Sequence, residues 1–132
     1  MENQNIEIMP LSPFHHEFKD QDGKLDNIDY FYLSADYTLN SQFNKQLEEI
    51  IINRQKNIDS KYKFYSIYIY RKTDELNENS KKDKTSFDGY NNDLLAYIRF
   101  ENKKLDIFYI IDDGNVIYDI IDKKETDFEF EN

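Results

Sequence analysis

The chain has 132 residues, a formal net charge of -10 and no cysteine. The lack of cysteine excludes disulfides and thiol chemistry, and the negative charge argues against direct binding to nucleic acid or to anionic membranes and favours a basic protein partner. The alternative interpretation is that the acidity only keeps the protein soluble. No apolar run approaches the roughly 18 residues of a spanning helix, and the N-terminus does not read as a secretory signal, so we expect a cytoplasmic protein. At this length, the simplest organisation is a single domain over residues 1–132.

The first third of the chain predicts strands joined by turns. Residues 6–10 form a short edge strand that ends at Pro10 and Pro13, and residues 14–19 and 25–35 form an N-terminal hairpin. The turn at residues 20–23 is similar to the middle of an EF-hand calcium loop. Phe18 stands at the first ligand position of such a loop and Asp29 at the position of its bidentate glutamate, so we interpret the segment as a hairpin turn.

Residues 40–57 carry the pattern of a helix. Asn40 or Ser41 provides the N-cap, and one side of the helix collects Phe43, Leu47, Ile50, Ile51 and Arg54 at helical spacing. Because a helix buries its apolar stripe against another element, this stripe is predicted to pack on the core face of a sheet.

The second half of the chain predicts an antiparallel meander. Strands are expected near residues 62–71, 93–101, 105–112 and 115–121, and residues 72–92 form a long polar connection of the kind that is either functional or mobile. Asp113-Gly114 suits a tight turn with two positive φ angles, and Asn102-Lys103 closes the preceding hairpin. The tail at residues 123–132 is either an edge strand or a frayed end.

These two turns fix a register for the meander. They pair Phe100 with Leu105, Ile98 with Ile107, Leu94 with Ile111, Asp112 with Asn115, Ile111 with Val116, Tyr109 with Tyr118 and Ile107 with Ile120. Side chains alternate along a strand, so one face becomes the predicted core: Leu94, Ala96, Ile98, Phe100, Leu105, Ile107, Tyr109, Ile111, Val116, Tyr118 and Ile120. The predicted fold is therefore α+β: a two-layer domain in which an antiparallel meander of at least four strands packs against one main helix, with an N-terminal hairpin.

No catalytic or metal site is predicted, and no cofactor. His15 and His16 are neighbours in a strand, so their side chains point to opposite faces and do not chelate one ion together. Asp122-Lys123-Lys124 matches the end of a nuclease motif, with Asp106 or Asp113 as an upstream ligand. Such a short match arises readily by chance in a chain rich in Asp and Lys, and the net charge would repel the substrate. A metal-dependent nuclease is therefore the third hypothesis, and we expect a protein that is not an enzyme.

The second face of the meander is the candidate binding surface. It carries aromatic side chains interleaved with carboxylates, an arrangement that suits protein interfaces, and Arg99 stands opposite Asp106 as a cross-strand ion pair. Its predicted residues are Tyr68, Tyr70, Tyr97, Arg99, Asp106, Phe108, Asp112, Ile117 and Asp119. The alternative is that this face is covered, either by the hairpin at residues 14–35 or by a second subunit. The sequence carries no signal for the oligomeric state.

This profile of a small, acidic, cysteine-free α+β protein resembles many bacterial immunity proteins and phage-encoded inhibitors, in general type and not through a motif. The resemblance implies a binding protein that neutralises a basic toxin or a defence nuclease by occlusion. The alternative hypothesis is a small-molecule-binding domain in which the sheet curves around an aromatic cavity.

Overall fold

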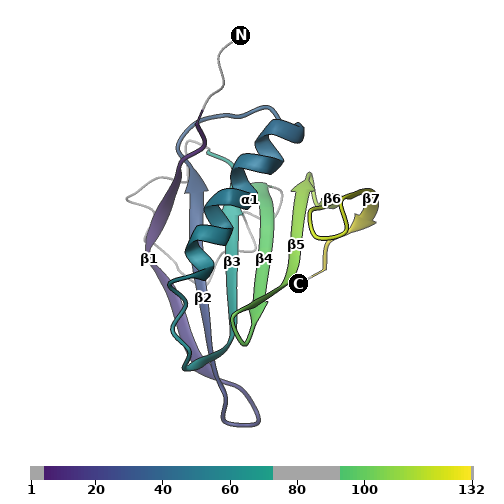
Figure 1. Ribbon diagram of the computed structural model, residues 1–132. Helices are drawn as coiled ribbons and strands as arrows, with labels where there is room; N and C mark the ends of the chain where they lie inside the picture. Colours follow the sequence, from purple (N-terminus) through teal and green to yellow (C-terminus); the bar gives the residue numbers. More distant parts are fainter. Residues whose placement is uncertain (1–4, 73–92, 132) are drawn as a thin grey trace.

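A computed structural model describes residues 5–72 and 93–131, apart from the side chains of residues 12–16. Among these residues there is one helix, α1 (Ser41–Gln55), which lies against one face of a seven-stranded sheet (Figure 1). The strands are β1 (Ile8–Lys19), β2 (Leu25–Leu33), β3 (Tyr62–Tyr70), β4 (Leu94–Glu101), β5 (Lys104–Asp112), β6 (Asn115–Asp119) and β7 (Lys124–Glu129). The predicted α+β class with one helix is confirmed, and the sheet is larger than the four strands required by the prediction. Most of the long polar connection, residues 73–92, lies outside the described residues.

The sheet is mixed because of one parallel pair of strands. β2 and β3 run parallel, and every other neighbouring pair is antiparallel. α1 connects the parallel pair, as parallel strands require a crossover that carries the chain back along the sheet. The predicted N-terminal hairpin is present as β1 and β2. It extends the sheet beside β3, so its strands are neighbours of the candidate face and do not form a cover over it.

β1 corrects the predicted start of the chain. The edge strand at residues 6–10 and the strand at residues 14–19 were expected as separate elements, but they form one strand that pairs with β2 at residues 8–10 and again at residues 15–19. The register shifts between Pro10 and His15, where Pro13 lies. Because proline cannot donate to a strand ladder, an edge strand with an irregularity is the place in a sheet where it is tolerated.

The helix begins and packs as its sequence indicates. The Asn40 side chain accepts a hydrogen bond from the Phe43 amide at 2.8 Å, which satisfies one of the free N–H groups at the helix N-terminus. Phe43, Leu47 and Ile51 are buried against the sheet, and Ile50 packs at the margin of the same cluster. No helix among the described residues combines the length and the apolarity needed to span a bilayer.

Both predicted turns of the meander are confirmed. Asn102 and Lys103 have φ angles of 50° and 70°, and Asp113 and Gly114 have φ angles of 48° and 83°. Two consecutive positive φ angles match the right-handed twist of the flanking strands and hold them in register near each turn. The predicted pairs next to the turns are accordingly present: Phe100 with Leu105, Ile111 with Val116, and Asp112 with Asn115.

Away from the turns, the predicted register is wrong by one residue. In the backbone register, Arg99 pairs with Ile107 and Ile110 pairs with Tyr118. The reason is that Asp106 in β5 and Ile117 in β6 are each an extra residue with no opposite residue on the neighbouring strand. Each such bulge exchanges the two faces of the strand beyond it. Phe108 therefore lies on the helix side with 0% of its surface exposed, and Ile107 faces the other way and is half-buried.

As a result, the sheet carries an apolar cluster on each face. The helix-side cluster contains Ile98, Phe100 and Ile120 as predicted, together with Leu95, Phe108 and Ile110 from the predicted second face. The opposite cluster contains residues that were predicted to lie under the helix, namely Leu94, Ile111 and Val116, with Leu11, Tyr32 and Tyr70. The helix therefore covers only one of the two apolar faces, and the other face carries the tyrosines.

Candidate functional site

A row of four tyrosines crosses the sheet on the face opposite the helix. Tyr30, Tyr68, Tyr97 and Tyr109 are direct cross-strand neighbours on β2, β3, β4 and β5, and we call them the tyrosine row. The ring centroids are 5.3 Å apart for Tyr30 and Tyr68, which are stacked, and 5.0 Å apart for Tyr68 and Tyr97, which are tilted. Aromatic pairs at these separations attract one another, so the rings of Tyr30, Tyr68 and Tyr97 support each other across three strands.

In three of these tyrosines, Tyr30, Tyr68 and Tyr109, the phenol has a raised pKa. Burial raises the pKa of Tyr68, and the neighbouring Tyr97 and Tyr30 add to the effect. Burial also raises the pKa of Tyr30, and burial followed by the nearby Asp119 raises the pKa of Tyr109. These three side chains therefore offer rings and neutral hydroxyl groups, and the charge of this surface comes from the residues around them.

Two ion pairs lie beside the row. Arg99 donates to the Asp106 Oδ2 atom from Nη2 at 2.5 Å and from Nε at 3.0 Å, which confirms the predicted cross-strand pair, and its guanidinium lies 5.0 Å from the centre of the Phe64 ring. Arg71 donates to Asp112. Two of the predicted binding carboxylates are thus already paired within the chain, so they contribute less attraction to a partner than free carboxylates would.

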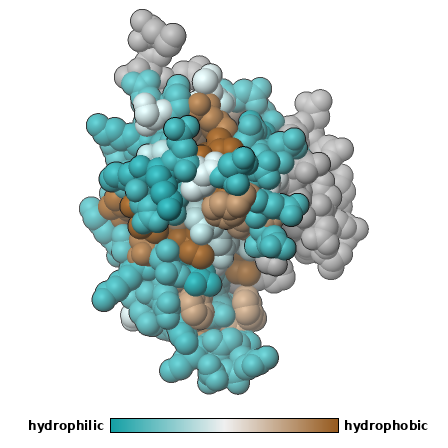
Figure 2. Space-filling view, turned by 90° about the vertical axis from the view of Figure 1, so that its right-hand side faces the viewer, coloured by the Kyte–Doolittle hydropathy of each residue, from teal (hydrophilic) through white to brown (hydrophobic). Residues whose placement is uncertain are grey.

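The strongest concentration of negative charge lies at the C-terminal edge of the sheet. Residues 112–131 contain eight carboxylates and two lysines, so this segment carries six of the ten net negative charges. Most of it forms β6 and the edge strand β7, and we call it the acidic edge (Figure 1). Seen from this side, the surface is mainly hydrophilic and is interrupted by smaller hydrophobic areas (Figure 2).

Aromatic side chains join the acidic edge to the tyrosine row. Phe128 packs edge-on against Tyr109 with ring centroids 5.5 Å apart, and Phe130 lies 5.3 Å from Tyr97. Phe128 is still 44% exposed, and Ile121 in the turn between β6 and β7 is 41% exposed. The edge therefore combines exposed apolar groups with carboxylates, next to the tyrosine row.

Most, but not all, of the predicted binding residues share this surface. Tyr68, Tyr97 and Arg99 lie on the face away from the helix, and Asp106 lies beside it through its pair with Arg99. Asp112 and Asp119 belong to the acidic edge. Tyr70 lies on the same face but is only 2% exposed, so it belongs to the apolar cluster and not to the accessible surface. Phe108 and Ile117 were placed there wrongly, because the two bulges put them on the helix side. Sequence reasoning missed the contributions of Tyr30 and Phe128. The alternation of Tyr30 and Tyr32 around a buried Phe31 was the available signal for the first.

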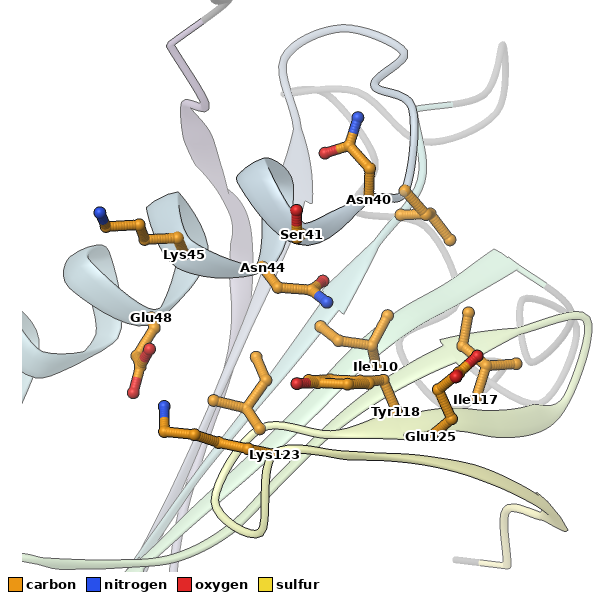
Figure 3. Close-up of a pocket in the computed structure, with 12 residues that line it drawn as sticks. Asn40, Ser41, Asn44, Lys45, Glu48, Ile110, Ile117, Tyr118, Lys123 and Glu125 are labelled. Atoms are coloured by element: carbon orange, nitrogen blue, oxygen red, sulfur yellow. The ribbon is translucent and has the colours of Figure 1, made fainter.

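A cavity of about 630 Å³ lies between the start of α1 and strands β5, β6 and β7 (Figure 3). Ile110, Ile117 and Ile120 form its apolar side, and Asn44 points into it from the helix. The buried Oδ1 atom of Asn44 has no hydrogen-bond partner among the described residues. The lining is mixed: beside the isoleucines stand polar and charged side chains, among them Lys45, Glu48 and Lys123. A cavity with an apolar side and a few polar groups has the general character of a small-molecule site.

The turn that is similar to a calcium loop uses its first carboxylate internally. The Asp20 Oδ1 atom accepts hydrogen bonds from the amides of Asp22 and Lys24, both at 2.9 Å, and Gly23 has a φ angle of 80°. This geometry is that of a hairpin turn stabilised by an aspartate side chain. The side chains of His15 and His16 lie outside the described residues.

No protein-family model, curated protein or solved structure was found to match the chain.

Proposed function

We propose that the protein binds a basic protein partner through the tyrosine row and the acidic edge, and neutralises it by occlusion. The observation that supports this most is that six of the ten net negative charges lie in residues 112–131, whose phenylalanine rings contact two tyrosines of the row. Acidity that served solubility alone would not need to gather at one edge of the sheet. A bacterial toxin or a defence nuclease is the class of partner that fits, because such proteins carry basic surfaces for nucleic acid.

The two parts of the surface have different roles in the proposed complex. Carboxylates act before contact, because their long-range attraction raises the association rate and selects the orientation of a basic partner. The aromatic side chains act after contact, because they bury large areas with little loss of side-chain entropy. Occlusion needs no chemistry on the side of this chain: the carboxylates occupy the positions where the partner would bind phosphates.

The test uses matched charge variants. Glu125→Gln, Asp127→Asn and Glu129→Gln together remove the three negative charges of β7, and Glu7→Gln, Asp36→Asn and Glu49→Gln remove three exposed negative charges elsewhere. Both triple variants have the same net charge. Partners captured by the wild-type protein are identified, and their association is then measured by surface plasmon resonance at several salt concentrations. We expect slower association and a flatter salt dependence for the β7 variant alone.

The aromatic part is tested by dissociation. Phe128→Ala removes an exposed ring without opening the core, and we expect faster dissociation with a loss of about 2 kcal/mol, or roughly thirtyfold in Kd, if this ring is a central anchor. The proposal would be contradicted if the two triple variants changed the association rate equally and Phe128→Ala did not change the dissociation rate. The negative charge would then serve only to keep the protein soluble.

Binding of a small molecule is the second candidate function, and the cavity beneath the start of α1 favours it. Its volume of about 630 Å³ falls within the range of known ligand sites, roughly 300–1,000 Å³. A ligand that fits this cavity has a hydrogen-bond donor for the buried Asn44 oxygen and an apolar part that packs against the isoleucines. A thermal-shift screen with amphipathic compounds that carry an N–H or O–H group tests this. Stabilisation that is lost in Asn44→Leu would support the cavity as a site, and the absence of any stabilising compound would count against it.

A further inference from the structure

A second cavity lies at the other end of the helix, away from the acidic edge. It has a volume of about 300 Å³ and is lined by residues of β2, the end of α1, the following turn and β3. These residues are Asn27, Asp29, Arg54, Asn57, Ile58, Asp59, Tyr62 and Tyr65. Its volume is at the lower limit of ligand sites, so it suits one small group rather than a drug-sized molecule. We call it the Asn27 pocket.

One wall of the pocket is a fixed polar cluster. The Tyr65 hydroxyl donates to the Asp29 Oδ2 atom at 2.6 Å and accepts from the Arg54 Nε atom at 3.4 Å. The Arg54 guanidinium lies 3.9 Å from the same Asp29 oxygen and 4.5 Å from the centre of the Phe31 ring. Burial and then the hydrogen bond to Asp29 raise the pKa of Tyr65, so its phenol remains neutral. The charge of Arg54 is therefore balanced within the chain.

The acceptor that remains is Asn27. Its side chain is only 7% exposed, and its buried Oδ1 atom has no hydrogen-bond partner among the described residues. A buried acceptor without a donor destabilises the folded state, because it has lost its hydrogen bond to water. An N–H group of a ligand in the pocket would remove that destabilisation, so the unsatisfied oxygen indicates which chemistry the pocket lacks.

Electrostatics favour a ligand with a positive charge. The lining contains the carboxylates of Asp29 and Asp59 but only one cation, Arg54. The pocket also lies where α1 ends at Gln55, and the negative end of a helix dipole favours cations in its last turn. Among the described residues, no group of three or more His, Asp or Glu side chains is placed to hold a metal ion, so an organic cation fits better than a metal.

We propose that the Asn27 pocket binds an organic cation that carries N–H donors, a guanidinium or a primary ammonium group, with one N–H donating to the Asn27 oxygen and the charge facing Asp59. The source of the group is either an arginine or lysine side chain of a peptide, or a small free amine. This inference is independent of the basic-partner function, since it concerns the helix side of the sheet and a different set of residues.

The test is a titration of the full chain, labelled with nitrogen-15 and followed by amide chemical shifts. Four small probes separate the two requirements: ethylguanidinium and ethylammonium are cations with N–H groups, tetramethylammonium is a cation without them, and urea has N–H groups without a charge. We expect saturable shifts around Asn27 and Tyr65 with the first two probes only. Binding of tetramethylammonium or urea as tight as that of ethylguanidinium would overturn the proposal, and so would the absence of shifts with all four.

Two variants test whether the probes bind at Asn27 and Asp59. Asn27→Leu removes the acceptor at similar volume, and we expect at least about tenfold weaker binding of ethylguanidinium, since a charge-assisted hydrogen bond is lost. The unliganded variant should melt no lower than the wild type, because an unsatisfied buried oxygen has been removed. Asp59→Asn keeps the side-chain oxygen that accepts a hydrogen bond from the Lys61 amide and removes the negative charge. The variant should therefore bind the cationic probes about threefold more weakly, or weaker still.

Asp36→Asn, at an exposed position in the connection before α1, is the matched charge control and should leave binding unchanged. Unaltered affinity in both Asn27→Leu and Asp59→Asn would overturn the proposal, and if Asn27→Leu does not fold, Asp59→Asn decides alone. A blocked arginine amide and a Gly-Arg-Gly peptide then identify the source: tighter binding of the peptide than of ethylguanidinium supports a side chain of a partner, and the reverse order supports a free amine. The β7 variants should leave these titrations unchanged.

Discussion

The bulge at Asp106 determines which of two adjacent side chains, Ile107 or Phe108, lies under the helix. We therefore expect truncation of these two residues to have very different effects on the free energy of unfolding. Phe108 is fully buried, pairs with Ile98 and belongs to the helix-side cluster. Truncation of a buried phenylalanine to alanine costs about 3–5 kcal/mol, which combines the lost transfer free energy with the cavity that remains. Ile107 is half-buried on the opposite face, so Ile107→Ala should cost about 1 kcal/mol.

The expected loss of unfolding free energy in Phe108→Ala is large compared with the total stability of a small domain. A loss of about 4 kcal/mol is a large part of the roughly 5–15 kcal/mol that separates folded from unfolded states. Urea titrations of the two variants and the wild type, fitted with a common slope, measure the two losses directly. Without the bulge, Ile107 would lie under the helix. A loss for Ile107→Ala that equals or exceeds the loss for Phe108→Ala would therefore refute the register.

Three further predictions concern single features. Asn40→Ala removes the helix N-cap and should cost about 1 kcal/mol in a urea titration, whereas Ser41→Ala, at an exposed neighbour, should change the free energy of unfolding by less than about 0.5 kcal/mol. Burial, and then the charge of Asp20, raise the pKa of Asp26 above its ordinary 3.8, so its ionisation destabilises the folded state as the pH rises. Asp26→Asn should therefore raise the melting temperature at pH 7, and this gain should vanish below pH 3.8, where the carboxyl is protonated in both states. Gly114→Ala places a side chain at a φ of 83° in open space, so only backbone strain opposes it; it should cost about 1 kcal/mol, and Gly114→Asn should cost less.

Local chemistry explains which parts of the fold could be predicted. A cap, a helical stripe and two turns with positive φ angles each depend on a few adjacent residues, and all of them are found in the structure. The bulges could not be predicted in the same way. Residues 107–111 of β5 are all apolar, so the run shows no alternation that would reveal on which face each side chain lies. One extra residue then moved Phe108 from the predicted binding face into the core.

The candidate site depends on pairings that are distant in sequence. Tyr30 lies beside Tyr68 because β2 and β3 are parallel neighbours. The sequence shows the strand–helix–strand order that produces such a pair. The first of these strands was predicted only as part of the N-terminal hairpin and was not placed beside residues 62–71. The Asn27 pocket depends on the same parallel pair, since Asn27 and Tyr65 are direct neighbours across it. Its key property, a buried oxygen without a partner, concerns the three-dimensional surroundings of one atom and has no counterpart in the sequence pattern.

The order of the strands in the sheet, which follows their order in the chain, has a consequence for synthesis. Each strand that leaves the ribosome finds its neighbour already made, so the sheet can grow from one side, and α1 supplies the only crossover between described strands. During this growth, the newest strand always presents open N–H and C=O groups to other chains. At the edge strand β7, the exposed carboxylates of Glu125, Asp127 and Glu129 oppose pairing with another chain, because they repel a second copy of the same edge.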